Sequence, residues 1–154
     1  MRQVNKSTID LIKFFEGFSA KPYHDSIDPP SVNTIGYGSI QYPNGTKVQL
    51  TDNPITEQQA NEYLTFEVNQ KAKAITPMIH ATLTDNQFGA LVSFAYNLGE
   101  GNLSQSTLLK KVNANPKDPS IQLEFDKWIY SNHLPVKGLE NRRRAEWKLY
   151  NTTT

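Results

Sequence analysis

The first stretch of the chain has apolar side chains at helical spacing between two boundary signals. Ser7 and Asp10 form a pattern that resembles a capping box, which is typical of a helix start. Gly17 suits the residue just past a helix end. The apolar positions between these signals are Ile9, Ile12 and Phe15. We therefore predict a helix from about residue 7 to 16.

Residues 18–50 show a different pattern, in which turn-forming residues separate short β-like pieces. Pro29, Pro30, Gly36 and Gly38 punctuate this stretch, and Tyr42-Pro43-Asn44-Gly45 is a hairpin-turn signal between two β-like segments. These features predict a small antiparallel β lobe over about residues 18–50.

The helical period returns after Pro54. A capping box over residues 56–59 opens a long amphipathic helix that ends before Pro77, and Thr84 opens another. In the second of these, Phe88 begins an apolar stripe that marks the core of the protein. Shorter helices are predicted near 105–114, 119–131 and 139–150.

These elements predict an α+β fold with an N-terminal helix, the β lobe and a larger helical lobe over about 55–150 that also includes the helix 7–16. We expect residues 1–154 to form a single domain, with a concave site where the lobes meet.

Composition removes several classes of function. The 154 residues are 37% hydrophobic, which is enough to bury a core, and they contain no Cys, which excludes disulfides and thiol chemistry. The three His residues lie far apart in the sequence, so we expect no metal site. No apolar run approaches about 18 residues, the length of a membrane span. The first 15 residues do not resemble a secretion signal, because Lys6, Asp10 and Lys13 interrupt them.

Charge is nearly balanced overall but uneven along the chain. Sixteen Lys and Arg face fifteen Asp and Glu, a net charge of +1, which argues against nucleic acid or another general polyanion as a partner. Residues 110–154 hold nine basic and five acidic side chains, and Arg142, Arg143 and Arg144 are consecutive. This run is either a solvated face or a patch that steers the protein toward a negatively charged polymer.

Two carboxylates and a hydroxyl surround the predicted start of the β lobe. Glu16 ends the first helix, Asp25 follows nine residues later, and Thr34 opens the Thr34–Gly38 segment, TIGYG. Glycosidic bond cleavage needs one protonated acid for the leaving oxygen and one ionised carboxylate for water. The end of a helix and partial burial both raise a carboxyl pKa, so Glu16 suits the first role and Asp25 the second.

Four motifs, in order along the chain, then make a specific resemblance. They are Glu16-Gly17 with Tyr23-x-Asp25 and TIGYG, the segment 83–91, the segment 94–99, and GLENRRRAE at 138–146. Together they resemble the phage-type lysozymes, the endolysins of glycoside hydrolase family 24. The resemblance covers about residues 7–150 and implies a lysozyme-like fold.

The resemblance implies a muramidase that hydrolyses the β-1,4 bond between N-acetylmuramic acid and N-acetylglucosamine in bacterial peptidoglycan. It makes Glu16 the general acid, Asp25 the carboxylate that holds the attacking water, and Thr34 a hydroxyl that helps to place this water. An inverting reaction of this kind needs carboxyl groups roughly 6.5–9.5 Å apart. No metal or organic cofactor is expected. The remaining candidates, assigned to substrate binding, are Gly36, Tyr37, Gly38, Asn97 and Arg143.

Several of these assignments have alternatives. Gly36 and Gly38 let sugars approach the backbone, or they only fit a twisted hairpin. Asn97 contacts substrate or caps the helix before Gly99. One arginine of the 142–144 run pairs with Glu16, as the resemblance suggests, and helical alternation favours Arg142 or Arg143.

The sequence departs from the family pattern at two places. Eight residues separate Asp25 from Thr34, where the family usually has five. Asp28 restores the five-residue gap but loses the spacing from Glu16, so we prefer Asp25, because a loop absorbs extra residues at little cost. Ser39 occupies a position where relatives commonly have His.

The resemblance also implies a biological setting. We expect a monomer that acts on peptidoglycan for host cell lysis, without membrane insertion. It would be made as a soluble protein in the host cytoplasm, without a signal peptide, and would reach the wall through a separate holin. The alternatives are a lytic transglycosylase, which needs no water-placing carboxylate, and a non-catalytic wall-binding or virion structural module on a lysozyme scaffold.

Overall fold

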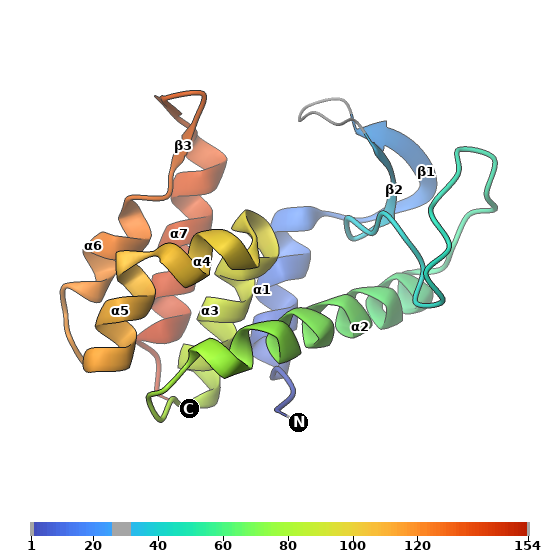
Figure 1. Cartoon of the computed structure of the whole chain (residues 1–154). Coiled ribbons are helices and arrows are strands. Elements are labelled where there is room, and N and C mark those ends of the chain that lie inside the picture. The colour runs from blue at the N-terminus through green and yellow to red at the C-terminus, as the bar shows by residue number, and fades with distance from the viewer. Residues whose placement is uncertain (1, 26–31, 154) are drawn as a thin grey trace. The chain divides into compact units, whose positions relative to one another are not determined.

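The computed structural model describes residues 2–25 and 32–153, except for the side chain of Asp25. Helices predominate and the strands are short (Figure 1). The α+β class predicted from the sequence is confirmed. The elements are α1 (Lys6–Glu16), β1 (Ser19–Asp25), β2 (Val32–Gly36), α2 (Glu57–Ile75), the 3-10 helix η1 (Thr76–Met78), α3 (Asp85–Leu98), α4 (Glu100–Gln105), α5 (Thr107–Ala114), α6 (Ile121–Asp126), β3 (Tyr130–Ser131), β4 (Leu134–Pro135) and α7 (Lys137–Tyr150).

The chain divides into two compact units. Residues 12–67 form one, which we call the β unit, and residues 1–11 with 68–154 form the other, which we call the helical unit. Helices α1 and α2 contribute residues to both units. The organisation of the chain as a single domain stays a prediction.

Helix α1 begins one residue earlier than predicted and has a different cap. The side chain of Asn5 accepts hydrogen bonds from the backbone N–H of Thr8 (3.1 Å) and from its hydroxyl (2.8 Å). The capping box expected at Ser7 is therefore wrong, because Asn5 already satisfies the donors of the first turn. At the other end, Gly17 has φ +70° and its N–H donates to the Lys13 carbonyl, as predicted for the residue after a helix.

Helix α2 follows its predicted pattern. Thr56 and Gln59 form the reciprocal hydrogen bonds of a capping box, and the helix ends at Ile75, before Pro77. Its buried stripe repeats at helical spacing and consists of Ala60, Leu64, Val68, Ala72 and Ile75.

The sheet of the β unit is a two-stranded antiparallel pair, β1 with β2. The predicted turn at Asn44-Gly45 is present, with Gly45 at φ +88° and its N–H donating to the Tyr42 carbonyl. However, the segments that flank it meet only in an isolated bridge between Gln41 and Lys47. The longer hairpin expected there does not form, because β2 pairs with the preceding strand and the chain reverses directly after it.

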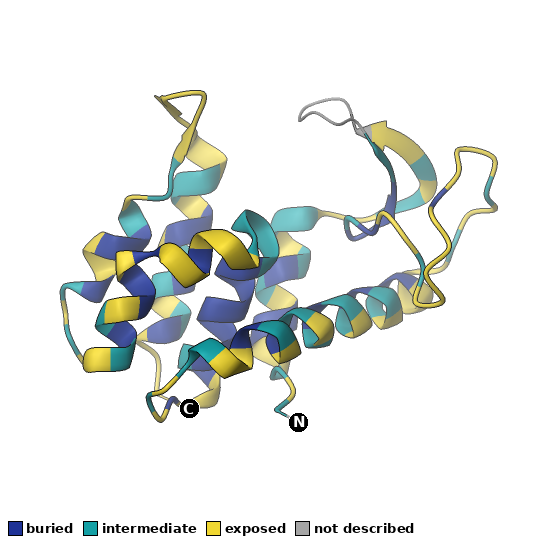
Figure 2. Cartoon of the chain, viewed as in Figure 1, coloured by how far each residue is buried: buried dark blue, intermediate teal, exposed yellow. Residues whose placement is uncertain are grey.

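The core of the helical unit is built on α3, which packs against α7 and α4 (Figure 2). Thr84 and Gln87 form a capping box at its start, and Gly99 at φ +96° ends it. Most of the helix is buried, from Phe88 to Ala95, so the prediction that this segment is the core is confirmed. Helix α6 packs against α5 and α7 and adds Phe125 to the same core.

One predicted boundary in this unit is wrong, and one helix was not predicted. Helix α6 ends at Asp126, and the residues expected to continue it form the hairpin β3–β4. Its turn residues Asn132 and His133 have φ of +50° and +66°, the conformation of a tight hairpin turn that helices exclude. Helix α4, a short helix with glycine at its N-cap and again at Gly101, was not predicted.

Candidate functional site

Glu16 is the last residue of α1, and its position follows from how that helix ends. The chain leaves the helix through the left-handed Gly17, and the side chain of Glu16 stays partly exposed. The carboxyl group therefore sits where the chain passes from α1 toward β1.

The carboxyl group of Glu16 lies directly over Gly38. A Cβ atom at residue 38 would come within 2.9 Å of Oε2 of Glu16 and 3.5 Å of its carboxyl carbon. Gly38 also has φ +90°, which L side chains rarely adopt. This residue therefore has two independent reasons to be glycine, and one of them is the space that the carboxyl group occupies.

The sheet places the remaining candidates of the β unit in register. Tyr23 pairs with Thr34, and Asp25, the last residue of β1, pairs with Val32. Thr34 is buried, and its hydroxyl oxygen lies 3.4 Å from the Val32 carbonyl, a long contact that holds the hydroxyl weakly. Asp28, the alternative carboxylate, lies outside the described residues.

Gly36 and Tyr37 occupy supporting positions. A Cβ atom on Gly36 would come within 3.1 Å of the Ala60 Cβ, so this glycine lets β2 approach the start of α2. Tyr37 is buried, and its hydroxyl donates to Oε1 of Glu57 at 2.9 Å. Burial, followed by this hydrogen bond to Glu57, raises the pKa of the Tyr37 phenol. Direct contact of Gly36, Tyr37 or Gly38 with substrate stays a prediction.

Asn97 and Arg143 meet inside the helical unit. Nη2 of Arg143 donates to Oδ1 of Asn97 at 2.8 Å, so the arginine on α7 fixes the amide on α3. Arg143 is completely buried, whereas Asn97 is partly exposed. Arg142 is also buried, while Arg144 is exposed and pairs with Glu140. Gly99, rather than Asn97, is the cap of α3.

Arg143 has a second partner that the sequence analysis missed. Glu146 is fully buried, with its Oε1 2.6 Å from Nε of Arg143, and its Oε2 accepts from the Ser93 hydroxyl at 2.6 Å. Nε of Arg142 lies 3.6 Å from the same carboxylate. Burial raises the pKa of Glu146, and the two arginines and Ser93 oppose this rise. The signal for this pair was the spacing of three residues between Arg143 and Glu146 on a helix.

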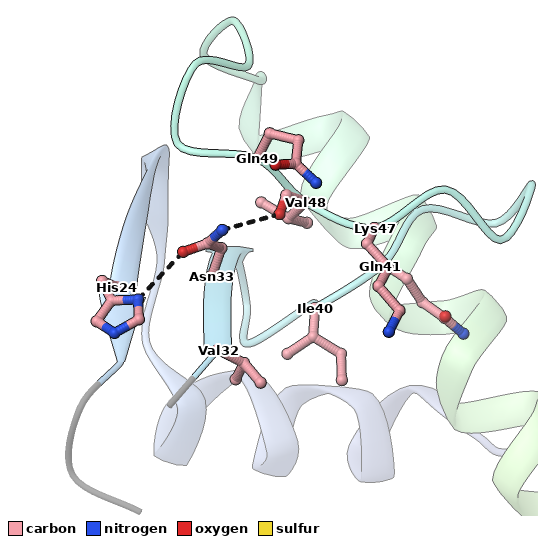
Figure 3. A pocket seen from close by; sticks show the side chains of 8 residues that line it. All are labelled: His24, Val32, Asn33, Ile40, Gln41, Lys47, Val48 and Gln49. Carbon is pink, nitrogen blue, oxygen red and sulfur yellow. Dashed lines mark hydrogen bonds between the residues drawn. The ribbon is translucent and has the colours of Figure 1, made fainter. Parts of the chain in front are cut away.

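The sequence also gave no sign of a pocket of about 270 Å³ in the β unit (Figure 3). Residues from β1, β2 and the segment after them line it, among them His24, Asn33 and Lys47. Their spacing matches no binding motif, and only the pairing of β1 with β2 brings His24 and Asn33 together.

Within residues 2–25 and 32–153, no three His, Cys, Asp or Glu side chains gather as metal ligands would. In the same part of the chain, no helix combines the length and the apolar character that crossing a bilayer requires.

Comparisons with known proteins extend over nearly the whole chain. The family described as phage lysozyme matches residues 13–146. The endolysin of Bacillus phage PZA is 36% identical over 152 residues, which are 99% of this chain and 56% of that endolysin. The chain thus spans little more than half the length of this curated relative.

Solved structures show the same similarity. The endolysin of Escherichia coli phage FAHEc1 has a TM-score of 0.86 and 34% identity, with 97% of this chain and 94% of that one covered. The muramidase domain of SpmX from Asticaccaulis excentricus has a TM-score of 0.82 and 27% identity, with 99% and 100% covered. The predicted lysozyme-like fold is therefore confirmed.

Proposed function

The chain belongs to the phage lysozyme family, and we propose that it is a muramidase that hydrolyses the β-1,4 bond between N-acetylmuramic acid and N-acetylglucosamine in peptidoglycan. The observation that carries this proposal is the carboxyl group of Glu16, which lies over the bare α-carbon of Gly38 in the TIGYG segment. The name of the SpmX muramidase domain, a relative in structure, is in keeping with this substrate bond.

In the proposed reaction, Glu16 is the general acid. It donates its proton to the glycosidic oxygen as the bond to the sugar breaks, which makes the leaving group a neutral alcohol. Asp25 holds and deprotonates the attacking water, and the Thr34 hydroxyl helps to place this water. The long contact of that hydroxyl with the Val32 carbonyl leaves it free to turn toward a better partner.

Attack by water on the face opposite the leaving group inverts the anomeric carbon. This arrangement needs space for one water molecule between the two acids, so we expect carboxyl groups of Glu16 and Asp25 about 6.5–9.5 Å apart in the substrate complex. A retaining enzyme would hold the two groups about 5 Å apart.

The other candidates support binding. Gly38 keeps the α-carbon under Glu16 clear, and Gly36 and Tyr37 hold this turn against α2 through Ala60 and Glu57. In the helical unit, we assign substrate contact to the partly exposed Asn97, with Arg143 fixing its amide.

For the protein in its setting, we propose a monomeric endolysin that opens the host wall at lysis. It would be made in the host cytoplasm and would reach the wall through a holin. The endolysin names of its relatives support this role. The reaction requires acid, base and water and no further cofactor.

Clearing of a suspension of peptidoglycan, or of cells stripped of their outer membrane, tests the proposal. We expect wild type to clear the suspension and Glu16→Gln to lose about 10²–10⁴-fold in rate, because an amide cannot donate the proton. Glu62→Gln, on the exposed side of α2, is the matched control and should clear at the wild-type rate.

Sedimentation with the wall and mass spectrometry of the released fragments separate the alternatives. If wild type sediments with the wall without clearing it, the chain is a non-catalytic wall-binding module and the proposal is wrong. If clearing produces anhydro-muramic ends, the chain is a lytic transglycosylase, and the role given to Asp25 is wrong.

A further inference from the structure

We propose that the pocket of the β unit binds the carboxylate-bearing stem peptide that peptidoglycan carries on N-acetylmuramic acid. This inference rests on the proposed function and adds a second recognition element beside the proposed catalytic residues. Figure 3 shows the residues that form it: His24, Val32, Asn33, Ile40, Gln41, Lys47, Val48 and Gln49.

A chain of hydrogen bonds fixes one wall of the pocket. Nδ2 of Asn33 donates to the Val48 carbonyl at 3.3 Å, so the amide oxygen of Asn33 faces the ring of His24. That oxygen lies 3.2 Å from Nδ1 of His24, which must therefore carry a proton. The neutral ring consequently presents Nε2 as an acceptor, and the protonated ring presents it as a donor.

Lys47 supplies the charge of the pocket. Within the described part of the chain, its ammonium group has no ion-pair partner, and no acidic side chain lines the pocket. Asp52, which follows Gln49 by three residues, is already engaged by the Gln49 N–H (2.8 Å) and the Tyr42 hydroxyl (2.7 Å). An anion that enters the pocket would thus meet one available cation.

The remaining lining selects among anions. The amides of Gln41 and Gln49 can donate to a carboxylate or to a peptide carbonyl, and Ile40, Val32 and Val48 offer aliphatic surface for a short side chain. A phosphate polymer is held chiefly by several cations along its length, and this pocket has one lysine. A short peptide with free carboxylates therefore fits the lining better.

The pocket lies next to the proposed site through the backbone. His24 directly precedes Asp25, and Asn33 directly precedes Thr34. Successive residues of a strand alternate between faces, so Asn33 and Thr34 are on opposite faces of β2. The proposal requires a stem peptide attached to a sugar near Thr34 to pass the edge of this two-stranded sheet, and four extended peptide residues span about 13 Å.

The test compares two substrates made from one preparation of glycan strands, one with its stem peptides and one from which an amidase has removed them. On strands with peptides, we expect Lys47→Gln to lower kcat/KM about three- to tenfold, mainly through KM. On stripped strands, the ratio of variant to wild type should return to about one. Lys47→Arg should retain most of the rate, and Lys73→Gln on the exposed side of α2 is the control.

An equal defect of Lys47→Gln on both substrates, or no defect on either, overturns the inference while the muramidase function stands. A defect that disappears when acid removes wall phosphate polymers assigns the pocket to those polymers and also overturns it. If wild type cleaves neither substrate, the proposed function fails. Titration with the free stem peptide then shows whether the pocket binds this peptide. Amide chemical shifts that change at His24 and Lys47 support binding, and unchanged shifts exclude it.

Discussion

Glu16 in the β unit and Glu146 in the helical unit are both glutamates on helices. Their exposure and their contacts differ, and we expect different roles for them. Glu16 ends α1, is partly exposed, and has its carboxyl group over the bare α-carbon of Gly38. Glu146 lies inside α7, is completely buried, and is held by Arg143 and Ser93.

This difference in exposure indicates which of the two carboxylates can act on a substrate. The carboxylate of Glu146 is enclosed by protein groups and has no exposed surface, so it has no access to a substrate. The side chain of Glu16, by contrast, is partly exposed. We therefore expect Glu16 and Asp25 of the β unit to affect turnover and Glu146 of the helical unit to affect folding.

The largest expected effect is on catalysis in the β unit. Asp25→Ala should reduce kcat by about 10²–10⁴-fold, the usual contribution of a general base, with little change in thermal stability. Asp28→Ala, measured beside it on the same peptidoglycan, should leave kcat close to that of wild type. Loss of turnover only in the Asp28 variant would transfer the role of base to Asp28.

Removing the buried charge of the helical unit should have the opposite signature. We expect Glu146→Gln to lower the free energy of unfolding by about 3–5 kcal/mol, because the completely buried Arg143 would lose the carboxylate with which it forms its ion pair. Urea denaturation followed by circular dichroism measures this.

Glu140→Gln provides the control on the same helix. Glu140 pairs with the exposed Arg144, and such surface pairs contribute about 0–1 kcal/mol. Equal losses in the two variants would show that burial does not separate the two kinds of carboxylate.

The glycine under Glu16 gives a smaller effect that tests the contact itself. Gly38→Ala should cost about 1–2 kcal/mol in stability because of its positive φ, and should also lower kcat, because the new methyl group displaces the Glu16 carboxyl. Gly45→Ala has the same backbone strain at φ +88° and no atom within 4 Å of its Cβ. It should lose similar stability and keep full activity. An equal fall in kcat for both variants would show that the contact between residue 38 and the Glu16 carboxyl group does not affect turnover.

The smallest effect is expected at Ser39, and Ser93 provides the comparison. Within the described residues, the hydroxyl of Ser39 is buried and has no hydrogen-bond partner, so Ser39→Ala should leave stability unchanged or raise it by up to about 1 kcal/mol. Ser93→Ala removes the 2.6 Å hydrogen bond to Glu146 and should cost about 1–3 kcal/mol. Thermal unfolding of both variants checks the pair, and a destabilised Ser39→Ala would reveal a partner for that hydroxyl.

Local signals predicted most of the fold. Capping boxes at Thr56 and Thr84 and apolar stripes along α2 and α3 depend on neighbours a few residues away, and these elements were predicted closely. The hairpin β3–β4 was missed because Phe125, Trp128 and Ile129 continue a helical spacing past the end of α6. The hairpin expected around Asn44-Gly45 failed for a different reason, since strand partners depend on contacts distant in sequence.

In the candidate site, too, local motifs predicted some features, whereas features that depend on contacts distant in sequence were missed. Motifs singled out Glu16, Thr34 and the glycines as candidates, because each belongs to a short segment with a recognisable order. The pocket beside His24 could not be predicted, because strand pairing assembles it from separate segments. Nor could spacing reveal that Gly36 contacts Ala60 while Gly38 contacts Glu16, because both have positive φ and differ only in their neighbours.

The most direct test of the muramidase proposal is mass spectrometry of the fragments that wild-type protein releases from purified peptidoglycan. We predict saccharides that end in reducing N-acetylmuramic acid, each heavier than its anhydro form by one water, and their absence after incubation with Glu16→Gln. Fragments ending in reducing N-acetylglucosamine, or the same products from Glu16→Gln at the wild-type rate, would contradict the account.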